Sequence, residues 1–337
     1  MTTFLQYFQG PLIIAALGFI AVWYQAGMAA LFIVVILSIL EITLSFDNAV
    51  VNAKVLAKMN PVWQKRFLTW GILIAVFGTR LVLPIVIVSI ALSTSPVFIT
   101  TLALTDPVAY GELLKGVEGA ITAFGGIFLF MVALKYFFEE GRSIRFIARI
   151  ERPFLQWGRL DVLEVAIAIS VLTGLSFISD FDQASILVAG FIGLLLFILM
   201  EGVGNILSAR SKNVAQSGLV LFIYLNILDS AFSLDGVVGA FALSSNLLVI
   251  VTGLCIGAYF VRALTLFMVA KNTLGHLVYL ERGSNFAILG LAISMLANLV
   301  MYVPVIITGL VGLACVLVAY YASIKVARKS SLASSPL

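Results

Sequence analysis

The sequence predicts an all-α, polytopic membrane protein with about ten transmembrane helices and an inverted repeat of three helices. Three observations predict this fold class: an apolar composition, a series of long apolar stretches and a duplicated acidic motif. Of the 337 residues, 62% are hydrophobic and 11% are charged. Soluble domains contain about 45–50% apolar and about 25% charged residues. The composition therefore excludes a soluble globular domain, a disordered chain, a coiled coil and a secreted disulfide scaffold.

The apolar stretches are long enough to cross a bilayer, which requires about 20 residues for each helix. The expected spans are 5–25, 29–57, 67–92, 117–138, 162–179, 184–206, 217–242, 246–270, 284–302 and 304–325. They divide the chain into an N-terminal membrane helix (1–28), a first three-helix repeat (29–138), a basic cytoplasmic loop with two linking membrane helices (139–216), a second, inverted three-helix repeat (217–303), and a last membrane helix with a cytoplasmic tail (304–337).

The cationic residues indicate sidedness, because Lys and Arg in short loops favour the cytoplasmic side of a membrane. Most of the 20 Lys and Arg residues fall in predicted loops on one side. The opposite side carries Lys115 among four acidic residues, Asp106, Glu112, Asp180 and Asp182. Both termini are therefore expected in the cytoplasm.

A few charged groups are expected at the membrane interface. Glu164 and Glu201 lie near the ends of predicted spans, and Lys135 is expected to extend toward the cytoplasm. The basic run from Arg142 to Arg159 contains interleaved aromatic residues. This pattern is typical of an interfacial helix on anionic lipid.

Two segments far apart in the chain resemble each other. Residues 39–50 read ILEITLSFDNAV, and residues 227–238 read ILDSAFSLDGVV. In each, an acidic residue is followed six positions later by Asp, which gives the pairs Glu41 with Asp47 and Asp229 with Asp235.

The similarity continues into the next predicted span of each half. Gly71 precedes Arg80 by nine residues, as Gly253 precedes Arg262. Two spans lie between the halves, so the second acidic helix is the fifth after the first, and an odd step reverses its direction. Inverted repeats of this kind build transporters that hold a site near the membrane midplane.

Ionisable side chains at membrane depth are costly unless they are paired or solvated, and they usually mark function. One interpretation is structural, with Asp47 paired to Arg80 and Asp235 paired to Arg262 as clips between helices. The other is a binding site, because four acids and two arginines leave an excess of two negative charges. One divalent cation would neutralise that excess.

Helix geometry restricts how the acids can meet. A six-residue step turns a side chain by about 240°, so Glu41 and Asp47 cannot share a face of an intact helix, whereas Ser45 and Asn48 lie on the Glu41 stripe. Either each acid has its own partner, or the helix unwinds around Thr43 to Asp47. Residues that would allow the same in the second half are Ser233, Asp235 and Gly236.

The available ligand atoms favour hard or borderline cations. Carboxylate, amide and hydroxyl oxygens suit Mg²⁺, Ca²⁺ and Mn²⁺. The only histidine, His276, lies in a predicted cytoplasmic loop, and Cys255 and Cys315 are far apart in apolar runs. A zinc or copper site of the soft type is therefore not expected.

These motifs give the sequence a family resemblance. It resembles the TerC-like integral membrane proteins (the tellurite-resistance protein C family), which belong with the lysine-exporter type of transporter. The family pattern is an acidic residue, five positions and Asp-Asn in an early span, then a late acidic pair; the matching residues are Glu41, Asp47, Asn48, Asp229 and Asp235. Further matches are Arg80, Arg262, Gly125, Gly126, Phe128, Leu129, Tyr279, Leu280 and Gly283. The second motif departs from the family by continuing with Gly236 in place of Ser.

The resemblance implies export of Mn²⁺ or a similar divalent ion from a bacterial cytoplasm across the inner membrane. The implied metal ligands are Glu41, Asp47, Asn48, Asp229 and Asp235. The supporting residues would be Ser45, Ser233, Arg80 and Arg262. We expect no enzymatic activity and no resident cofactor, since the metal is the cargo. The expected partners are membrane lipid and the metal ion, with no nucleic acid, and the oligomeric state is open.

Two other classes of function compete with transport. A membrane scaffold or metal-stress accessory protein would have no flux of its own. An intramembrane aspartyl protease would use Asp47 and Asp235 as a dyad that shares a proton. That chemistry gives Glu41, Asp229 and the two arginines no role.

Overall fold

The computed structural model describes residues 2–57, 59–138, 162–210, 214–244, 246–271 and 279–333, and all regular structure in these ranges is helical. The predicted all-α class is therefore confirmed for this part of the chain. The helices are α1 (Thr2–Leu44), α2 (Phe46–Leu56), α3 (Pro61–Leu73), η1 (Ile74–Val82), α4 (Leu83–Ala91), α5 (Pro96–Thr105), α6 (Pro107–Gly116), α7 (Glu118–Phe138), α9 (Leu163–Ile178), α10 (Gln183–Arg210), α11 (Val214–Leu243), α12 (Leu247–Ala270), α14 (Leu280–Ala297) and α15 (Val305–Ala333).

The surface of the bundle is that of a membrane protein. Five stretches are long and apolar enough to cross a bilayer: Gln6–Leu44, Glu118–Phe138, Gln183–Gly202, Leu247–Ala270 and Gly309–Val326. Large apolar side chains are exposed on the outer helices, among them Ile20 of α1, Phe177 of α9, Leu195 of α10 and Tyr321 of α15. Such continuous apolar exposure is unfavourable in water and favourable in lipid. The protein is a helical, multi-pass membrane protein.

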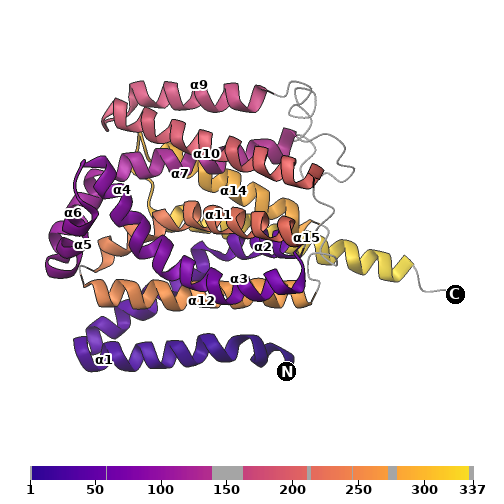
Figure 1. Cartoon of the computed structure of the whole chain (residues 1–337). Coiled ribbons are helices and arrows are strands. Elements are labelled where there is room, and N and C mark those ends of the chain that lie inside the picture. Colours follow the sequence, from indigo (N-terminus) through magenta and orange to yellow (C-terminus); the bar gives the residue numbers. More distant parts are fainter. Residues whose placement is uncertain are drawn as a thin grey trace.

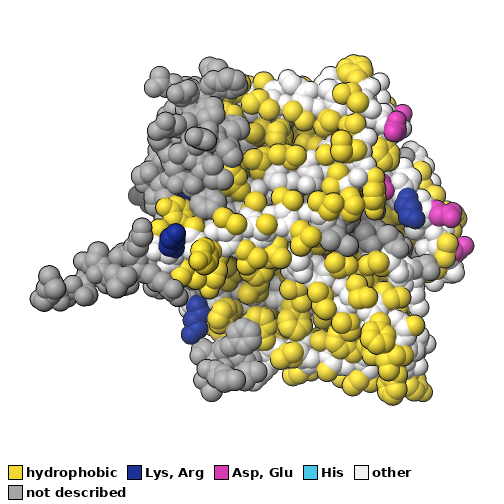
Figure 2. Space-filling model, turned by 180° about the vertical axis from the view of Figure 1, so that it is seen from behind, with side chains coloured by type: hydrophobic (Ala, Val, Ile, Leu, Met, Phe, Trp, Pro, Cys, Tyr) yellow, Lys and Arg dark blue, Asp and Glu magenta, His cyan; other side chains and the backbone are white. Residues whose placement is uncertain are grey.

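The two ends of the bundle differ in charge. The long helices run along one common direction, and both termini lie at the same end, which we call the terminal end (Figure 1, right). The opposite end is formed by α5 and α6 and is called the α5–α6 end (Figure 1, left). On the face shown in Figure 2, the side chains at one end are Lys and Arg, and most of the charged side chains at the other end are Asp and Glu. Apolar side chains fill the band between them.

A turn at Gly27 folds α1 back on itself. Gly27 has φ 81° and ψ −175°, a conformation that favours glycine. We call the helical segments of α1 before and after Gly27 the first and the second rod. Gly10 and Gly18 of the first rod lie against Tyr259 and Thr252 of α12, and Leu37 of the second rod lies against Gly253 of α12. Both rods therefore pack on α12, in opposite directions. This agrees with the separate spans expected at 5–25 and 29–57.

The sequence did not predict α5 and α6 as helices. Each has ten residues and begins with proline in its first turn. Ser95 caps α5 by accepting from Val97 N at 3.3 Å, and Asp106 caps α6 by accepting from Ala109 N at 3.1 Å. A capping oxygen and a proline are typical start signals. These helices are too short to span a bilayer, and they cover one end of the bundle (Figure 1).

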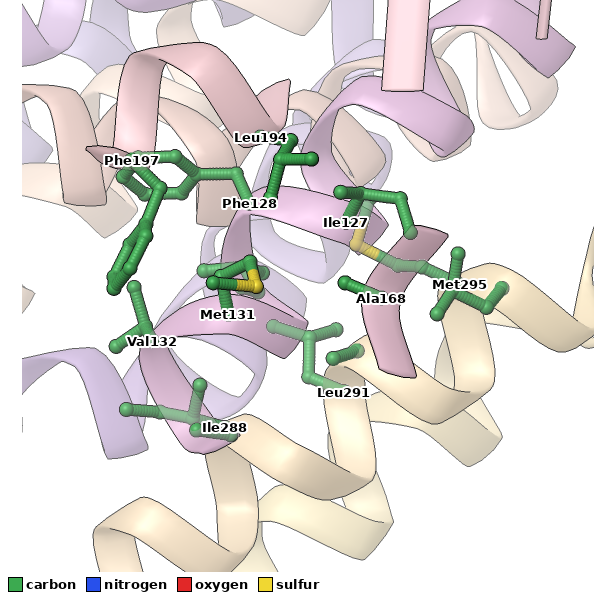
Figure 3. Packing of buried hydrophobic residues seen from close by; sticks show 14 of the residues in the cluster. Ile127, Phe128, Met131, Val132, Ala168, Leu194, Phe197, Ile288, Leu291 and Met295 are labelled. Carbon is green, nitrogen blue, oxygen red and sulfur yellow. The ribbon is translucent and has the colours of Figure 1, made fainter. Parts of the chain in front are cut away.

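The main core surrounds α7. Ile127, Phe128 and Met131 of this helix are fully buried. Side chains of α9, α10 and α14 meet them, as Figure 3 shows for Ala168, Leu194, Phe197, Ile288, Leu291 and Met295. The third helices of the two predicted repeats, α7 and α14, therefore pack against each other.

A close helix contact within this core gives a stability prediction. A Cβ added at Gly193 of α10 would lie 2.4 Å from the backbone oxygen of Phe124, which cannot move aside as a side chain could. We expect Gly193→Ala to lower the free energy of unfolding by about 1–3 kcal/mol. Gly202→Ala, on the same helix, meets nothing within 4 Å and should be neutral or stabilising, because alanine favours the helix. Thermal unfolding in detergent checks both; equal midpoints would contradict the packing argument.

Candidate functional site

Glu41 lies in the second rod of α1 and is buried, with 2% of its surface exposed. It forms an ion pair with Arg80 of η1. The hydroxyl of Ser45 also donates to Glu41 Oε1 at 3.1 Å. A buried carboxylate is stable only with such partners. The first acid of the first motif is thus charge-paired.

The Glu41 side chain rests on a groove of small residues in α12. A Cβ at Gly257 would lie 2.5 Å from the Glu41 Cβ and Cγ atoms, and Ser38 Oγ donates to Gly253 O at 3.2 Å. The Gly253 and Gly257 pair therefore allows α1 and α12 to approach closely, as small residues do between membrane helices. This close approach brings Glu41 to the helix that carries Arg262.

Arg80 lies in a π-helical segment, η1, that was not predicted. Pro84 lacks a backbone N–H, and its ring crowds the carbonyl of the residue four positions earlier, which is Arg80. This explains why the helix widens here. The Arg80 side chain also donates through Nη1 to the carbonyl of Ala75. Segments of π-helix occur frequently at functional sites.

The second half contains the corresponding pair. Arg262 Nη2 donates to Asp229 Oδ2 at 2.9 Å, and both residues are buried. The Arg262 guanidinium lies over the ring of Phe67, 3.9 Å from its centroid. Gly71 leaves room for this guanidinium, because a Cβ there would lie 3.0 Å from Arg262 Nη1.

The two pairs are neighbours. The hydroxyls of Thr79 and Ser230, which adjoin Arg80 and Asp229 in sequence, lie 3.1 Å apart in a hydrogen bond. Arg80 is attracted by Asp229 as well as by Glu41, and the two arginines repel each other. We call these four ionic residues the ion-pair cluster. The described partners of its arginines are the first acids of the two motifs, whereas the clip interpretation had assigned the second acids.

The helix break expected near Thr43 to Asp47 is a single residue. Ser45, with φ −99° and ψ 14°, separates α1 from α2. Helical hydrogen bonds still enter and leave it, from Ser45 N to Glu41 O and from Ala49 N to Ser45 O. Glu41 therefore has its own partner, as the first alternative requires of each acid, and the backbone departs from helical geometry only at Ser45 without unwinding.

The second half shows no break at Ser233, Asp235 and Gly236, the residues that would have allowed one. Helix α11 continues from Val214 to Leu243. Ser and Gly cost a helix interior about 1 kcal/mol or less each, so these residues permit a break without forcing one.

The remaining predicted ligands and supporting residues lie on α2 and α11. Asn48 of α2 is buried, with 2% of its surface exposed. The backbones of Asp47 in α2 and of Ser233 and Asp235 in α11 are helical, and their side chains lie outside the described part of the structure, as does His276. Among the described residues, no three His, Cys, Asp or Glu side chains gather into a possible metal site.

Two buried asparagines, Asn52 and Asn226, were not among the site residues predicted from the sequence. Asn52 of α2 is fully buried, and neither its Oδ1 nor its Nδ2 has a hydrogen-bond partner among the described residues. Asn226 of α11 is also buried; its Nδ2 donates to Phe222 O at 2.7 Å, and its Oδ1 has no described partner. The Glu41 stripe could have predicted Asn52, which follows Asn48 by one helical turn.

A cavity of about 390 Å³ adjoins the cluster at Arg80. Its walls come from α4, α5, α6 and α12, and they are mainly aliphatic, with Ile85, Ala103, Ile250 and Leu254 among them. It therefore approaches the ion-pair cluster from the α5–α6 end.

A third ionic group lies apart from this cluster. Lys135 of α7 contacts Glu201 of α10 at 2.6 Å and Glu164 of α9 at 3.6 Å. Glu164 lies in the first turn of α9, near a helix end as expected, and its side chain is buried against the neighbouring helices. Arg282, which the predicted spans place in a cytoplasmic loop, is also buried, in α14.

Comparison with known proteins identifies a family for the chain. A family model described as "Protein of unknown function (DUF475)" matches residues 46–330. The matched region contains Asp47, Arg80, Asp229, Asp235 and Arg262 and begins just after Glu41. No curated protein and no solved structure matches the chain. Because the match covers well over half of the sequence, this chain belongs to the DUF475 family.

Proposed function

We propose that this protein is a transporter that exports a divalent metal cation, with Mn²⁺ as the first candidate, across the bacterial inner membrane. The observation that carries the proposal is the proximity of two buried acid–arginine pairs from corresponding positions of the two halves, which the hydrogen bond between Thr79 and Ser230 brings together. A structural clip needs one pair at one helix contact. A duplicated pair that meets in the interior of the bundle is the arrangement of a site between two repeats.

The charge balance favours a divalent cargo. Glu41 and Asp229 are neutralised by Arg80 and Arg262 within the ion-pair cluster. Asp47 and Asp235 follow them by six residues on the same helical runs and would add two negative charges. We propose that these two acids, with Asn48, bind the metal, while Arg80 and Arg262 act as positioning residues that hold Glu41 and Asp229.

The proposed topology has ten spans, two inverted repeats and both termini in the cytoplasm. The sorting of charges between the two ends of the bundle supports this orientation. The resemblance to TerC-like proteins supports the same reaction class. The protein is proposed to act without a cofactor and without enzymatic chemistry.

Reconstitution tests the proposal directly. Proteoliposomes that contain the purified protein should take up or release Mn²⁺ faster than empty liposomes, and Ca²⁺ and Mg²⁺ are the comparison ions. A deletion strain should be more sensitive to the ion that moves. If none of the three ions crosses the liposome membrane, the transporter is refuted and an accessory role is favoured.

Exchange for protons is the proposed return step. Burial in a medium of low dielectric constant favours the neutral form of a carboxyl group, so protons could replace the metal on the acids. We expect Mn²⁺ flux to depend on external pH and to carry protons in the opposite direction, measured with an entrapped pH indicator. A flux that is insensitive to pH would contradict this coupling and leave the transport of metal intact.

A further inference from the structure

The unpartnered amides of Asn52 and Asn226 need an explanation. A buried amide group without a hydrogen bond costs about 1–3 kcal/mol, and native proteins rarely leave such groups unpaired. Asn52 has two atoms in this state and Asn226 has one. Three polar atoms without described protein partners therefore lie inside the bundle, on helices that also carry the proposed site.

The packing of α2 and α11 places these amides at a common level. Leu56 of α2 and Phe222 of α11 belong to one buried cluster with Met59, Phe67 and Leu225, which we call the terminal plug. The two helices run in opposite directions, α2 toward the terminal end and α11 away from it (Figure 1). Asn52 precedes Leu56 by four residues and Asn226 follows Phe222 by four, so each lies one turn farther from the terminal end.

The same level adjoins the ion-pair cluster. Asp229 follows Asn226 by three residues, and Asn48 precedes Asn52 by four. On both helices, positions three or four apart lie on one face. Along α11, Asn226 therefore lies between Phe222 of the terminal plug and Asp229 of the ion-pair cluster, and Asn52 of α2 lies one turn from Leu56 of the plug.

The orientation of Asn226 indicates the chemistry of a guest. Its Nδ2 is already used by the carbonyl of Phe222 in its own helix, which leaves Oδ1 as the available atom. Amide oxygens are ligands of hard cations and acceptors for the water molecules such cations retain. Asn52 offers both an oxygen and a donor, which together fit a metal-bound water.

We propose that Asn52 and Asn226 form a second binding site, for a partly hydrated divalent cation, at the level of α11 between Phe222 and Asp229. The inference rests on the proposed function and adds a second site at which the transported cation would bind, on the side of the terminal end. Because both ligands are neutral, this site binds more weakly than the carboxylates. Conduction requires sites from which an ion can leave. The buried side chains of the terminal plug lie on the side of this site that faces the terminal end.

The test compares alanine variants of these asparagines with a variant of a fully bonded asparagine. Asn298 is the matched control, since its Nδ2 donates to Glu118 at 3.4 Å and its Oδ1 accepts from Val303 N at 2.9 Å. Mn²⁺ flux into proteoliposomes and thermal unfolding in detergent are measured for each variant. Asn52→Ala and Asn226→Ala should each raise the half-saturating Mn²⁺ concentration about tenfold or more, without a lower unfolding midpoint. Asn298→Ala should show the reverse pattern, and Asn52→Asp should restore saturation at low Mn²⁺.

The outcomes separate the two proposals. If the wild-type protein moves Mn²⁺ and both alanine variants saturate as it does, the second site is refuted and transport stands; the amides then hold water or nothing. A lower unfolding midpoint with unchanged saturation would assign them a structural role and also refute the site. If the wild-type protein moves no ion, the proposed function fails, and the second site fails with it.

Discussion

Arg262→Leu is expected to lower the free energy of unfolding by about 3–5 kcal/mol, because it leaves the Asp229 carboxylate buried without its counter-charge. The substitution also removes the stacking of the guanidinium on Phe67. The measurement is unfolding in detergent, followed by helical circular dichroism. A loss this large would make Arg262 one of the most sensitive positions in the described structure.

The double variant separates stability from function. Replacing both members of a buried ion pair by apolar residues is often neutral or stabilising, so Asp229→Leu with Arg262→Leu should recover most of the lost stability. If the pair is part of a transport site, the recovered protein stays inactive in the flux assay. A double variant that is stable and moves Mn²⁺ at the wild-type rate would reduce the pair to a structural clip.

Asp47→Asn is expected to lower Mn²⁺ flux by about 100-fold or more, which corresponds to about 2.7 kcal/mol of lost ligand interaction. The amide keeps the size of the side chain and one oxygen ligand and removes the negative charge that the divalent cation requires. Flux into proteoliposomes and growth of a complemented deletion strain on Mn²⁺ both report the effect. A scaffold would keep its phenotype with this substitution.

A matched carboxylate outside the membrane is the control. Asp182 caps α10 by accepting from Ser185 N at 2.8 Å, and the hydrogen bonds from Ser185 lower the pKa of Asp182. Asparagine is an equally good capping residue, so Asp182→Asn should fold normally and transport at the wild-type rate. Equal losses in both variants would mean that surface charge, and not a specific ligand, controls the flux.

Hydropathy predicted the helices where an apolar run coincides with a helix boundary signal. The spans expected at 162–179 and 246–270 correspond to α9, Leu163–Ile178, and α12, Leu247–Ala270. The latter begins at the capping side chain of Asn246, which accepts from Leu248 N at 3.0 Å. The short helices α5 and α6 were not predicted from hydropathy, because segments of ten residues that contain Thr, Pro and Gly give no transmembrane signal. The sequence signal for the π-helical segment η1 was Pro84, and the prediction did not use it.

The site was less predictable than the helices. The sequence spacing of the charged residues identified the buried acids and arginines. It could not show which of the two acids in each motif pairs with the arginine. That choice depends on the rotation of α1 before Ser45 and on the close approach that Gly257 permits. Asn52 was missed because a neutral amide is a weak signal in an apolar run, although its burial without partners is more unusual than a paired charge.

The π-helical segment has a consequence for how this chain tolerates insertion and deletion. A π turn contains one more residue than an α turn, so removal of one residue between Ile74 and Val82 can be absorbed by return to an α-helix. In α12, which has no such surplus, the same deletion would rotate all that follows by about 100° and turn Arg262 away from Asp229. Length variation among family members is therefore expected in the first arginine-bearing helix and excluded from the second.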